Sequence, residues 1–197
     1  VPSSFVLGKS ASVATALQQA EKIGYPLFVK PVKAGSSFGI TKVSSSNELP
    51  AALELAFEYD KRVIVEECIS GFEVGCAIIG DEDLTAGEVD EIELSGGFFN
   101  FTEKYTLKTS AIHVPARIPQ NTAEQIKQAA KTIYRTLDCQ GFARVDLFLT
   151  PSGEIVFNEV NTIPGFTTHS RYPNMMKAAG FTFEQIVSAL IEQAVRE

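Results

Sequence analysis

The sequence has few features of membrane or secreted proteins. Its 197 residues contain no uninterrupted run of 18 or more apolar residues, which is the length that a membrane-spanning helix requires. The opening segment VPSSFVLGKS lacks the basic and then apolar pattern of a signal peptide. We therefore expect a soluble protein without a membrane partner.

Cysteine and histidine are too scarce and too scattered to build a disulfide framework or a zinc site. The three cysteines, Cys68, Cys76 and Cys139, are odd in number and form no CxxC pair. The two histidines, His113 and His169, lie far apart in the sequence. We expect buried free thiols in a reducing cytoplasm.

Basic residues are outnumbered, with 17 Lys and Arg against 24 Asp and Glu and a formal charge of −7. This balance argues against general attraction to nucleic acid. A Walker A loop is also missing, because Ser3 stands where the motif before Gly8-Lys9-Ser10 requires glycine. Any phosphate must therefore be held by another local arrangement.

What is present predicts an α+β fold with two lobes, 1–86 and 87–197. The chain's 45% hydrophobic content is enough for one substantial core or two small lobes that share an interface. In the first lobe we expect helices capped by Ser10 and Asn47, and strands in YPLFVKP, ITKV, RVIVEE and EVGCAIIG. In the second we expect strands in 87–94, FARVDLFLT and EIVFNEV, and helices at 122–137, 173–179 and 183–195. Hairpin turns favour antiparallel pairing over a doubly wound parallel sheet.

The final hairpin carries the most informative polar residues. Strand side chains alternate between faces. The first strand therefore places Arg144, Asp146 and Phe148 together, and the second places Phe157, Glu159 and Asn161 together. Carboxylate and amide oxygens suit Mg²⁺, which binds protein oxygens together with substrate phosphates. The alternative is an ordinary salt bridge from Arg144 to Asp146 or Glu159.

A lysine and a glycine-serine segment indicate a phosphate site. Lys30 ends an apolar strand and is followed by Ala-Gly-Ser-Ser-Phe-Gly at 34–39. Glycines allow close backbone approach to an anion, serines add donors, and the lysine supplies positive charge. A plain glycine-serine turn remains the alternative.

Two acidic residues, Glu66 and Glu73, flank the connector in VIVEECISGFE. A strand end followed by a short connector and an acidic residue suits an adenosine site, in which Glu73 meets the ribose hydroxyls. A solvated acidic turn is the other interpretation.

Three segments, VKPVKAGSSFGITKV, GFARVDLFL and NEVNTIPGFTTHSRYP, resemble the ATP-grasp portion of D-alanine–D-alanine ligases and their vancomycin-resistance relatives. The resemblance covers nearly the whole chain. It implies a cytoplasmic ligase of peptidoglycan synthesis, with ATP held between mainly antiparallel sheets. It also implies two Mg²⁺ ions as cofactors, with Mn²⁺ as an alternative.

The resemblance also implies roles for individual residues. The implied ATP-binding residues are Lys30, Ser36, Ser37, Glu66, Ile69, Glu73, Lys104 and Phe157. The implied metal ligands are Asp146, Glu159 and Asn161, and the implied catalytic residues are Arg144, Gly165, Ser170 and Tyr105. Second-substrate selectivity is assigned to Tyr105 and Arg171.

The implied reaction transfers phosphate from ATP to the carboxylate of D-alanine, and a second substrate then attacks the acylphosphate. Tyr105 and Arg171 favour D-serine over D-alanine or D-lactate as that substrate. Complete ligases carry an additional N-terminal domain and are expected to be homodimers, and nothing in this sequence corresponds to that domain. The alternatives are a housekeeping D-alanine–D-alanine ligase, another ATP-grasp ligase, or a nucleotide-binding module that is inactive by itself.

Overall fold

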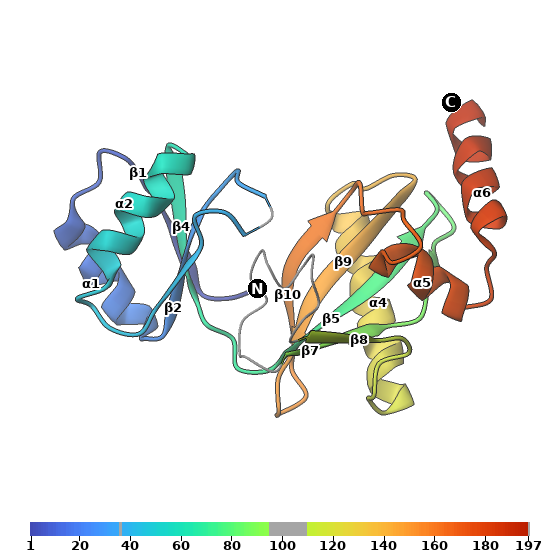
Figure 1. Ribbon diagram of the computed structural model, residues 1–197, viewed down its shortest axis with the longest axis horizontal. Coiled ribbons are helices and arrows are strands. Elements are labelled where there is room, and N and C mark those ends of the chain that lie inside the picture. The colour runs from blue at the N-terminus through green and yellow to red at the C-terminus, as the bar shows by residue number, and fades with distance from the viewer. Residues whose placement is uncertain (36, 95–109, 197) are drawn as a thin grey trace. The chain divides into compact units, whose positions relative to one another are not determined.

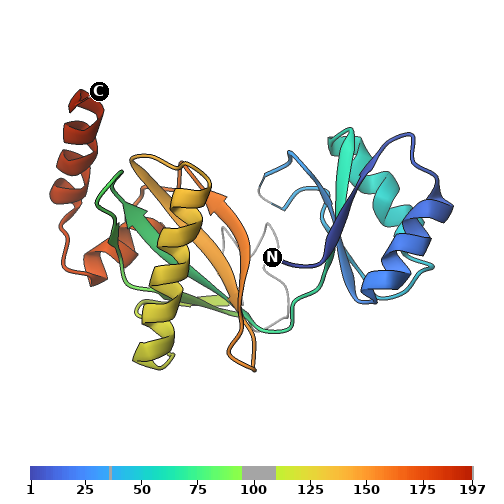
Figure 2. The same ribbon diagram turned by 180° about the vertical axis from the view of Figure 1, so that it is seen from behind.

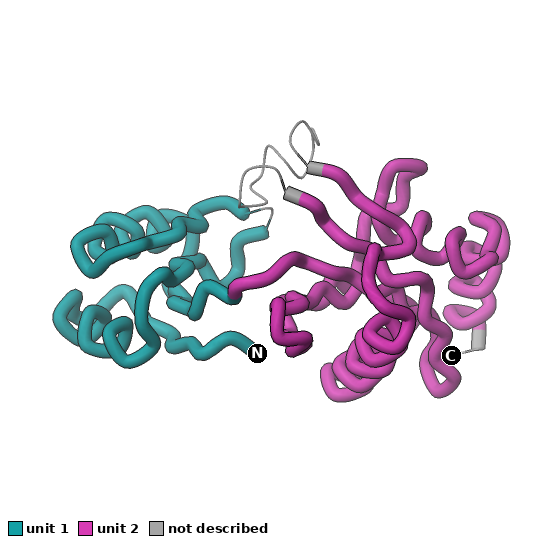
Figure 3. The backbone as a smooth tube through the Cα atoms, turned by 90° about the horizontal axis from the view of Figure 1, so that it is seen from below, with its two compact units in different colours: residues 1–69, 96–109 teal, residues 70–95, 110–197 magenta. Residues whose placement is uncertain are grey.

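A computed structural model describes residues 1–35, 37–94 and 110–196, and these residues form two compact units. Figure 3 shows the division, which places residues 1–69 in unit 1 and the remaining described residues in unit 2. All strand pairings among the described residues are antiparallel. The predicted α+β class is therefore confirmed.

Within residues 1–69, unit 1 contains a four-stranded sheet and two helices (Figure 1). Its elements are β1 (Ser4–Gly8), α1 (Val13–Ile23), β2 (Leu27–Pro31), β3 (Thr41–Val43), α2 (Leu49–Tyr59) and β4 (Arg62–Glu67). The strand order is β1-β4-β2-β3. Each of the strands expected for residues 1–69 is present.

One face of the unit 1 sheet is apolar and is covered by both helices. Leu27 and Val29 alternate along β2 with Phe28 and Lys30, and only the first pair is fully buried. The helices contribute small residues such as Ala16, so they pack closely on this face. Lys30 therefore lies on the opposite face.

Both helices of unit 1 begin slightly later than the sequence suggested. The cap of α1 is Ser12 rather than Ser10, because the Ser12 hydroxyl accepts a 3.1 Å hydrogen bond from the backbone N–H of Thr15. The N-cap residue of α2 is Glu48 rather than Asn47.

Unit 2 is built on a second sheet, in the order β10-β9-β5-β7-β8, with β6 paired to β5. Its strands are β5 (Phe72–Ile79), β6 (Thr85–Ala86), β7 (Asp90–Leu94), β8 (Ser110–His113), β9 (Phe142–Leu149) and β10 (Ile155–Asn161). Its helices are α4 (Gln120–Thr136), α5 (Arg171–Ala178) and α6 (Phe183–Arg196).

The sequence placed β5 in the first lobe, and this placement is wrong. The strand pairs along its length with β9, and it also pairs with β7 and β6. The division between the units accordingly follows Ile69 rather than residue 86. Local alternation identifies a strand, but the partner that completes its hydrogen bonds is distant in sequence, so the pattern does not name it.

The two faces of the unit 2 sheet have different covers. Helix α4 packs its buried residues, including Ile126 and Tyr134, against Val74 and Leu147. The other face meets α5 and α6 in a separate apolar cluster that includes Tyr172. Figure 2, which is turned by 180° from Figure 1, shows α4 in front of the sheet.

The cysteines only partly match expectation. All three are free thiols, but only Cys76 is buried, and burial raises its pKa to about 12. Cys68 and Cys139 are half-buried.

No helix among the described residues is long and apolar enough to cross a bilayer.

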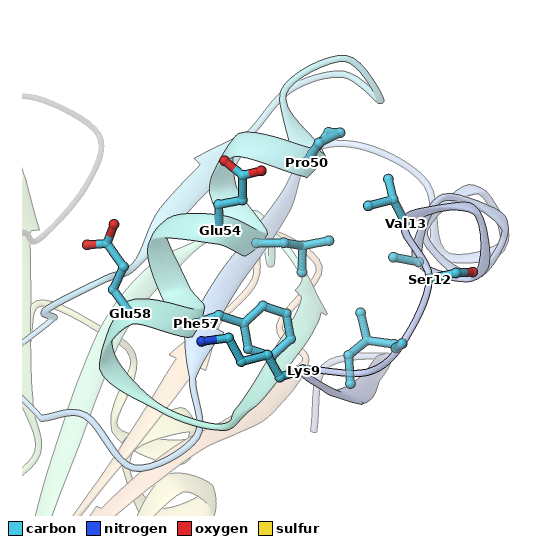
Figure 4. A pocket seen from close by; sticks show the side chains of 11 residues that line it. Lys9, Ser12, Val13, Pro50, Glu54, Phe57 and Glu58 are labelled. Atoms are coloured by element: carbon cyan, nitrogen blue, oxygen red, sulfur yellow. The ribbon is translucent and has the colours of Figure 1, made fainter.

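Unit 1 also has an apolar cavity of about 310 Å³ on its helical side (Figure 4). Leu53 and Phe57 of α2 line it, and Lys9, Glu54 and Glu58 add charge. None of the predicted site residues lines this cavity. It is therefore distinct from the residues considered below.

Candidate functional site

Two of the unit 1 candidates, Lys30 and Glu66, lie on the sheet face opposite to α1 and α2. Lys30 of β2 forms an ion pair with Glu66 of β4, and its ammonium also lies 5.7 Å from the centre of the Phe28 ring. The register pairs Phe28 with Glu66 and Lys30 with Ile64, so all four share one face. The structure thus brings two of the predicted ATP-binding residues together.

The predicted phosphate loop follows β2. Ser37 has a φ of 61° and Gly39 a φ of 69°, so both residues adopt the left-handed conformation that glycine accepts more readily than serine. Ser36 lies outside the described residues. Ile69, predicted to border adenine, is half-buried just beyond β4. This part of the chain provides the tight backbone turn that an anion-binding loop needs.

In unit 2, four neighbouring strands each place one residue in a row across the sheet. The register pairs Asp90 of β7 with Gly75 of β5, Gly75 with Asp146 of β9, and Asp146 with Glu159 of β10. Directly paired residues of antiparallel strands share a face. Three carboxylates therefore cross one face of the sheet, with a glycine between two of them.

Arg171 of α5 lies over the gap that Gly75 leaves. A Cβ at residue 75 would stand 2.5 Å from the Arg171 Nη2 and 2.8 Å from the Asp90 Oδ1. Arg171 donates to Asp90 at 2.7 and 2.8 Å and to Glu73 at 2.9 Å, and its Nη1 lies 3.4 Å from the Asp146 Oδ1. The side chain that the sequence linked to a second substrate thus bonds carboxylates on three strands.

The charges of this cluster stabilise the protonated form of Arg171. Burial by itself would lower the pKa of the guanidinium, but the charges of Asp90, Asp146 and Glu73, with the hydrogen bonds to Asp90, hold it well above its usual value. Asp90 is fully buried and was missed by sequence reasoning. Its signal was present, because alternation in DEIEL puts Asp90 on the same face as buried Ile92.

Arg144 and Asn161 complete the surroundings of Asp146. Arg144 donates to both carboxylate oxygens at 2.7 Å, and Asn161 donates its amide to Asp146 at 2.8 Å and to Glu159 at 3.4 Å. The Arg144–Asp146 ion pair, which the sequence left as an alternative to a metal site, is therefore present. Asp146 is fully buried, whereas Glu159 is exposed.

Phe157 does not share the face of Glu159 and Asn161, so that expectation is wrong. A β-bulge lies between Phe157, which pairs with Leu147, and Glu159, which pairs with Asp146. The extra residue, Asn158, reverses the alternation. Phe157 consequently packs in the α4 core rather than beside the carboxylates.

Gly165 and Ser170 meet each other in the segment before α5. A Cβ at Gly165 would lie 2.9 Å from the Ser170 hydroxyl, which also accepts a 3.0 Å hydrogen bond from the backbone N–H of Thr167. The two predicted catalytic residues therefore lie in close contact, and a side chain at 165 would displace the Ser170 hydroxyl. Lys104 and Tyr105 lie outside the described residues.

The donor set near Asp146 fits a hard cation. Asp146, Glu159 and Asn161 offer oxygen ligands, which Mg²⁺ prefers over nitrogen and sulfur. Within the described ranges no three His, Cys, Asp or Glu side chains are arranged as a metal site, so the amide of Asn161 is a necessary member. Because that amide donates to Asp146, cation binding would require it to present its oxygen instead.

Comparison with known proteins decides the family. A model described as the D-alanine–D-alanine ligase C-terminus matches residues 5–192. The chain belongs to this ligase family. VanB, the vancomycin B-type resistance protein of Enterococcus faecalis, is 48% identical over 206 residues, which cover 97% of this chain and 60% of VanB.

A solved structure and a further relative from this ligase family are also similar to the chain. The crystal structure of the VanG D-Ala:D-Ser ligase from Enterococcus faecalis has 60% identity and a TM-score of 0.90, covering 98% of this chain and 56% of VanG. The D-alanine–D-alanine ligase of Acetivibrio thermocellus is 44% identical over 177 residues, covering 89% of this chain and 47% of that enzyme. The chain thus spans about half to 60% of its relatives' lengths. It has the ATP-grasp fold of these ligases.

Proposed function

We propose that this chain is the ATP-binding part of a ligase that joins D-alanine to a second D-configured substrate through an acylphosphate. The observation that carries the proposal is the cluster of Asp146, Glu159 and Asn161 on one face of β9 and β10, in a chain of this ligase family. Two carboxylates and an amide suit MgATP, since Mg²⁺ binds protein oxygens together with phosphates.

These three residues would hold two Mg²⁺ ions. Bound there, the ions would offset the negative charge of the transferred phosphoryl group. Arg144 keeps the buried Asp146 oriented through two hydrogen bonds of 2.7 Å. As the resemblance implies, Arg144 and the backbone N–H of Gly165 would stabilise the oxyanion that forms when the second substrate attacks.

Lys30 would bind the inner phosphates from unit 1. Its ion pair with Glu66 keeps the ammonium on the sheet face opposite to the helices, where a polyanion would compete for it. Glu66 and Ile69 would border the adenine, and Glu73 would contact the ribose. Glu73 also accepts a hydrogen bond from Arg171, which fixes the direction of its carboxylate.

D-Serine is our proposed second substrate, and the 60% identity to the VanG D-Ala:D-Ser ligase supports it. Tyr105, which adds no positive charge, favours an amino-acid acceptor over D-lactate. Arg171 is occupied by carboxylates, so we propose that it affects selectivity through Asp90 and Glu73. The whole enzyme would serve peptidoglycan synthesis and glycopeptide resistance in the cytoplasm as a homodimer.

The test has two stages. Isothermal calorimetry should show that the chain binds ATP in the presence of Mg²⁺, and that Glu159→Gln weakens this Mg²⁺-dependent binding at least about tenfold, or about 1.4 kcal/mol. With the N-terminal domain supplied, phosphate release should be fastest with D-alanine plus D-serine. Activity with D-lactate as the only accepted second substrate would contradict the substrate proposal. Unchanged Mg²⁺-dependent ATP binding by Glu159→Gln would contradict the metal assignment.

A housekeeping D-alanine–D-alanine ligase is the second candidate. Its support is the 44% identity to the Acetivibrio thermocellus enzyme. The same assay separates the two, because a housekeeping enzyme would release phosphate faster with D-alanine alone than with added D-serine.

A further inference from the structure

The segments on both sides of the predicted phosphate loop are attached to one short region, residues 59–62, where α2 ends and β4 begins. On the incoming side, the Lys33 N–H donates a 2.8 Å hydrogen bond to the Asp60 Oδ2, and the Val32 N–H donates to the Arg62 carbonyl at 3.0 Å. Asp60 is itself fixed, because its Oδ1 accepts from the Arg62 N–H at 3.3 Å. The start of the loop is thus held by backbone donors.

On the outgoing side the contact is aromatic. The rings of Phe38 and Tyr59 are stacked with centres 6.3 Å apart and planes 30° apart. Gly39 is packed so closely that a Cβ there would lie 2.6 Å from the Tyr59 Cδ2 and 2.9 Å from the Pro31 Cγ. Glycine is therefore required by contact as well as by its φ of 69°.

These aromatic rings are not needed to fill the core. Phe38 is 47% exposed and Tyr59 is 50% exposed, and neither belongs to the apolar cluster under the helices. Ser37, between the two anchored limbs, has a left-handed backbone that a surrounding structure must hold in place. A stacked pair beside such a turn restricts the movement of Phe38 and Gly39.

We propose that Tyr59 and Asp60 are positioning residues for ATP phosphate binding. Asp60 holds residues 32 and 33 on the incoming side of the predicted phosphate loop, and Tyr59 holds Phe38 and Gly39 on the outgoing side. This inference rests on the proposed function. Neither residue need touch the nucleotide. Their effect is to remove conformational freedom from the loop before binding, which lowers the entropy lost when phosphate is bound.

The experiment compares Tyr59→Ala, Tyr59→Phe and Asp60→Ala with the unaltered chain, and uses Leu55→Ala, at an exposed position of α2, as the matched control. Calorimetry measures the binding of MgATP and of adenosine, which has no phosphate. We expect Tyr59→Ala and Asp60→Ala to weaken MgATP binding about tenfold and to leave adenosine binding unchanged. Tyr59→Phe, which keeps the stacked ring, and Leu55→Ala should bind both ligands normally.

Hydrogen exchange of the ligand-free proteins gives an independent readout. Tyr59→Ala should speed exchange at residue 38, and Asp60→Ala should speed exchange at residue 33, while β2 and β4 keep their protection. Unchanged exchange at these residues would overturn the inference whether or not MgATP binds. An equal weakening of MgATP binding and of adenosine binding would also overturn it. Failure of the unaltered chain to bind MgATP would overturn the proposed function instead. The exchange measurement would then still test whether Tyr59 and Asp60 hold the segments beside the loop.

Discussion

At the scale of single residues, Asp146 is the group on which the charged contacts of unit 2 converge. It is fully buried, and it receives hydrogen bonds from Arg144 and Asn161 and lies 3.4 Å from Arg171. Glu159, its neighbour in the row, is exposed. The two predicted metal ligands therefore differ in what they contribute to folding.

We expect Asp146→Ala to lower the free energy of unfolding by about 3 kcal/mol, because it leaves the Arg144 guanidinium without its buried partner. Glu159→Ala should change it by less than about 0.5 kcal/mol, since the side chain is exposed. Urea denaturation of the ligand-free proteins measures both values. Similar losses in the two variants would contradict this difference, while both should still impair Mg²⁺-dependent nucleotide binding.

At the scale of elements, the paired strands β7 and β8 have an ionic cluster on the face opposite to Asp90. Arg117 donates to Glu91 at 2.6 Å through its side chain and at 2.9 Å through its backbone N–H. Glu93 accepts from His113 at 2.7 Å and forms an ion pair with Arg117 at 3.0 Å. The hydrogen bond from the Arg117 side chain is the main reason that the pKa of Glu91 is below its ordinary value.

The pKa of Glu91 is lower in the folded chain than in the unfolded chain, where it has its ordinary value of about 4.3. Its contribution to stability is therefore complete at pH values above about 4.3, and it is lost as the pH falls through the lower pKa of the folded chain. Glu91→Gln should therefore melt at a lower temperature than the unaltered chain at pH 7, with a difference that shrinks towards pH 3. Melting curves across this range provide the measurement. Glu154→Gln, at an exposed position of unit 2, is the control and should show no such trend. A constant difference for Glu91→Gln would contradict the assignment.

Elements could be predicted from the sequence more reliably than their partners. Alternation located both strands of the β9–β10 hairpin and put Glu159 and Asn161 on the face of Asp146. It failed at Phe157, because a bulge adds a residue without any distinctive sequence signal. Asp90 was also missed, although alternation put it on the face of buried Ile92, because its significance depends on Arg171, 81 residues away.

At the scale of the whole molecule, the apolar residues form separate cores. The core of unit 1 joins β1 to β4 with α1 and α2, and unit 2 has one cluster on each face of its sheet. The sequence allowed either one core or two, because composition fixes how much apolar area is buried but not how it is divided.

We expect a core substitution in unit 1 to affect that unit first. Leu27→Ala should lower the stability of unit 1 by about 2–5 kcal/mol, since Leu27 is fully buried. Hydrogen exchange should then accelerate in β2 and β4 and remain slow in β5 and β9, because the clusters are separate. Equal acceleration in both units would show instead that they unfold as one.

The contact between Arg171 and the acidic row has a consequence for synthesis on the ribosome. The strands that carry Asp90, Asp146 and Glu159 all precede residue 171 in the chain. A nascent chain that ends after β10 contains the row without the guanidinium that lies over Gly75. Unit 1 has all its described strands and helices once residue 69 has emerged, whereas the charge of buried Asp90 in unit 2 is balanced only after α5 is made. Translation order therefore favours folding of unit 1 before unit 2.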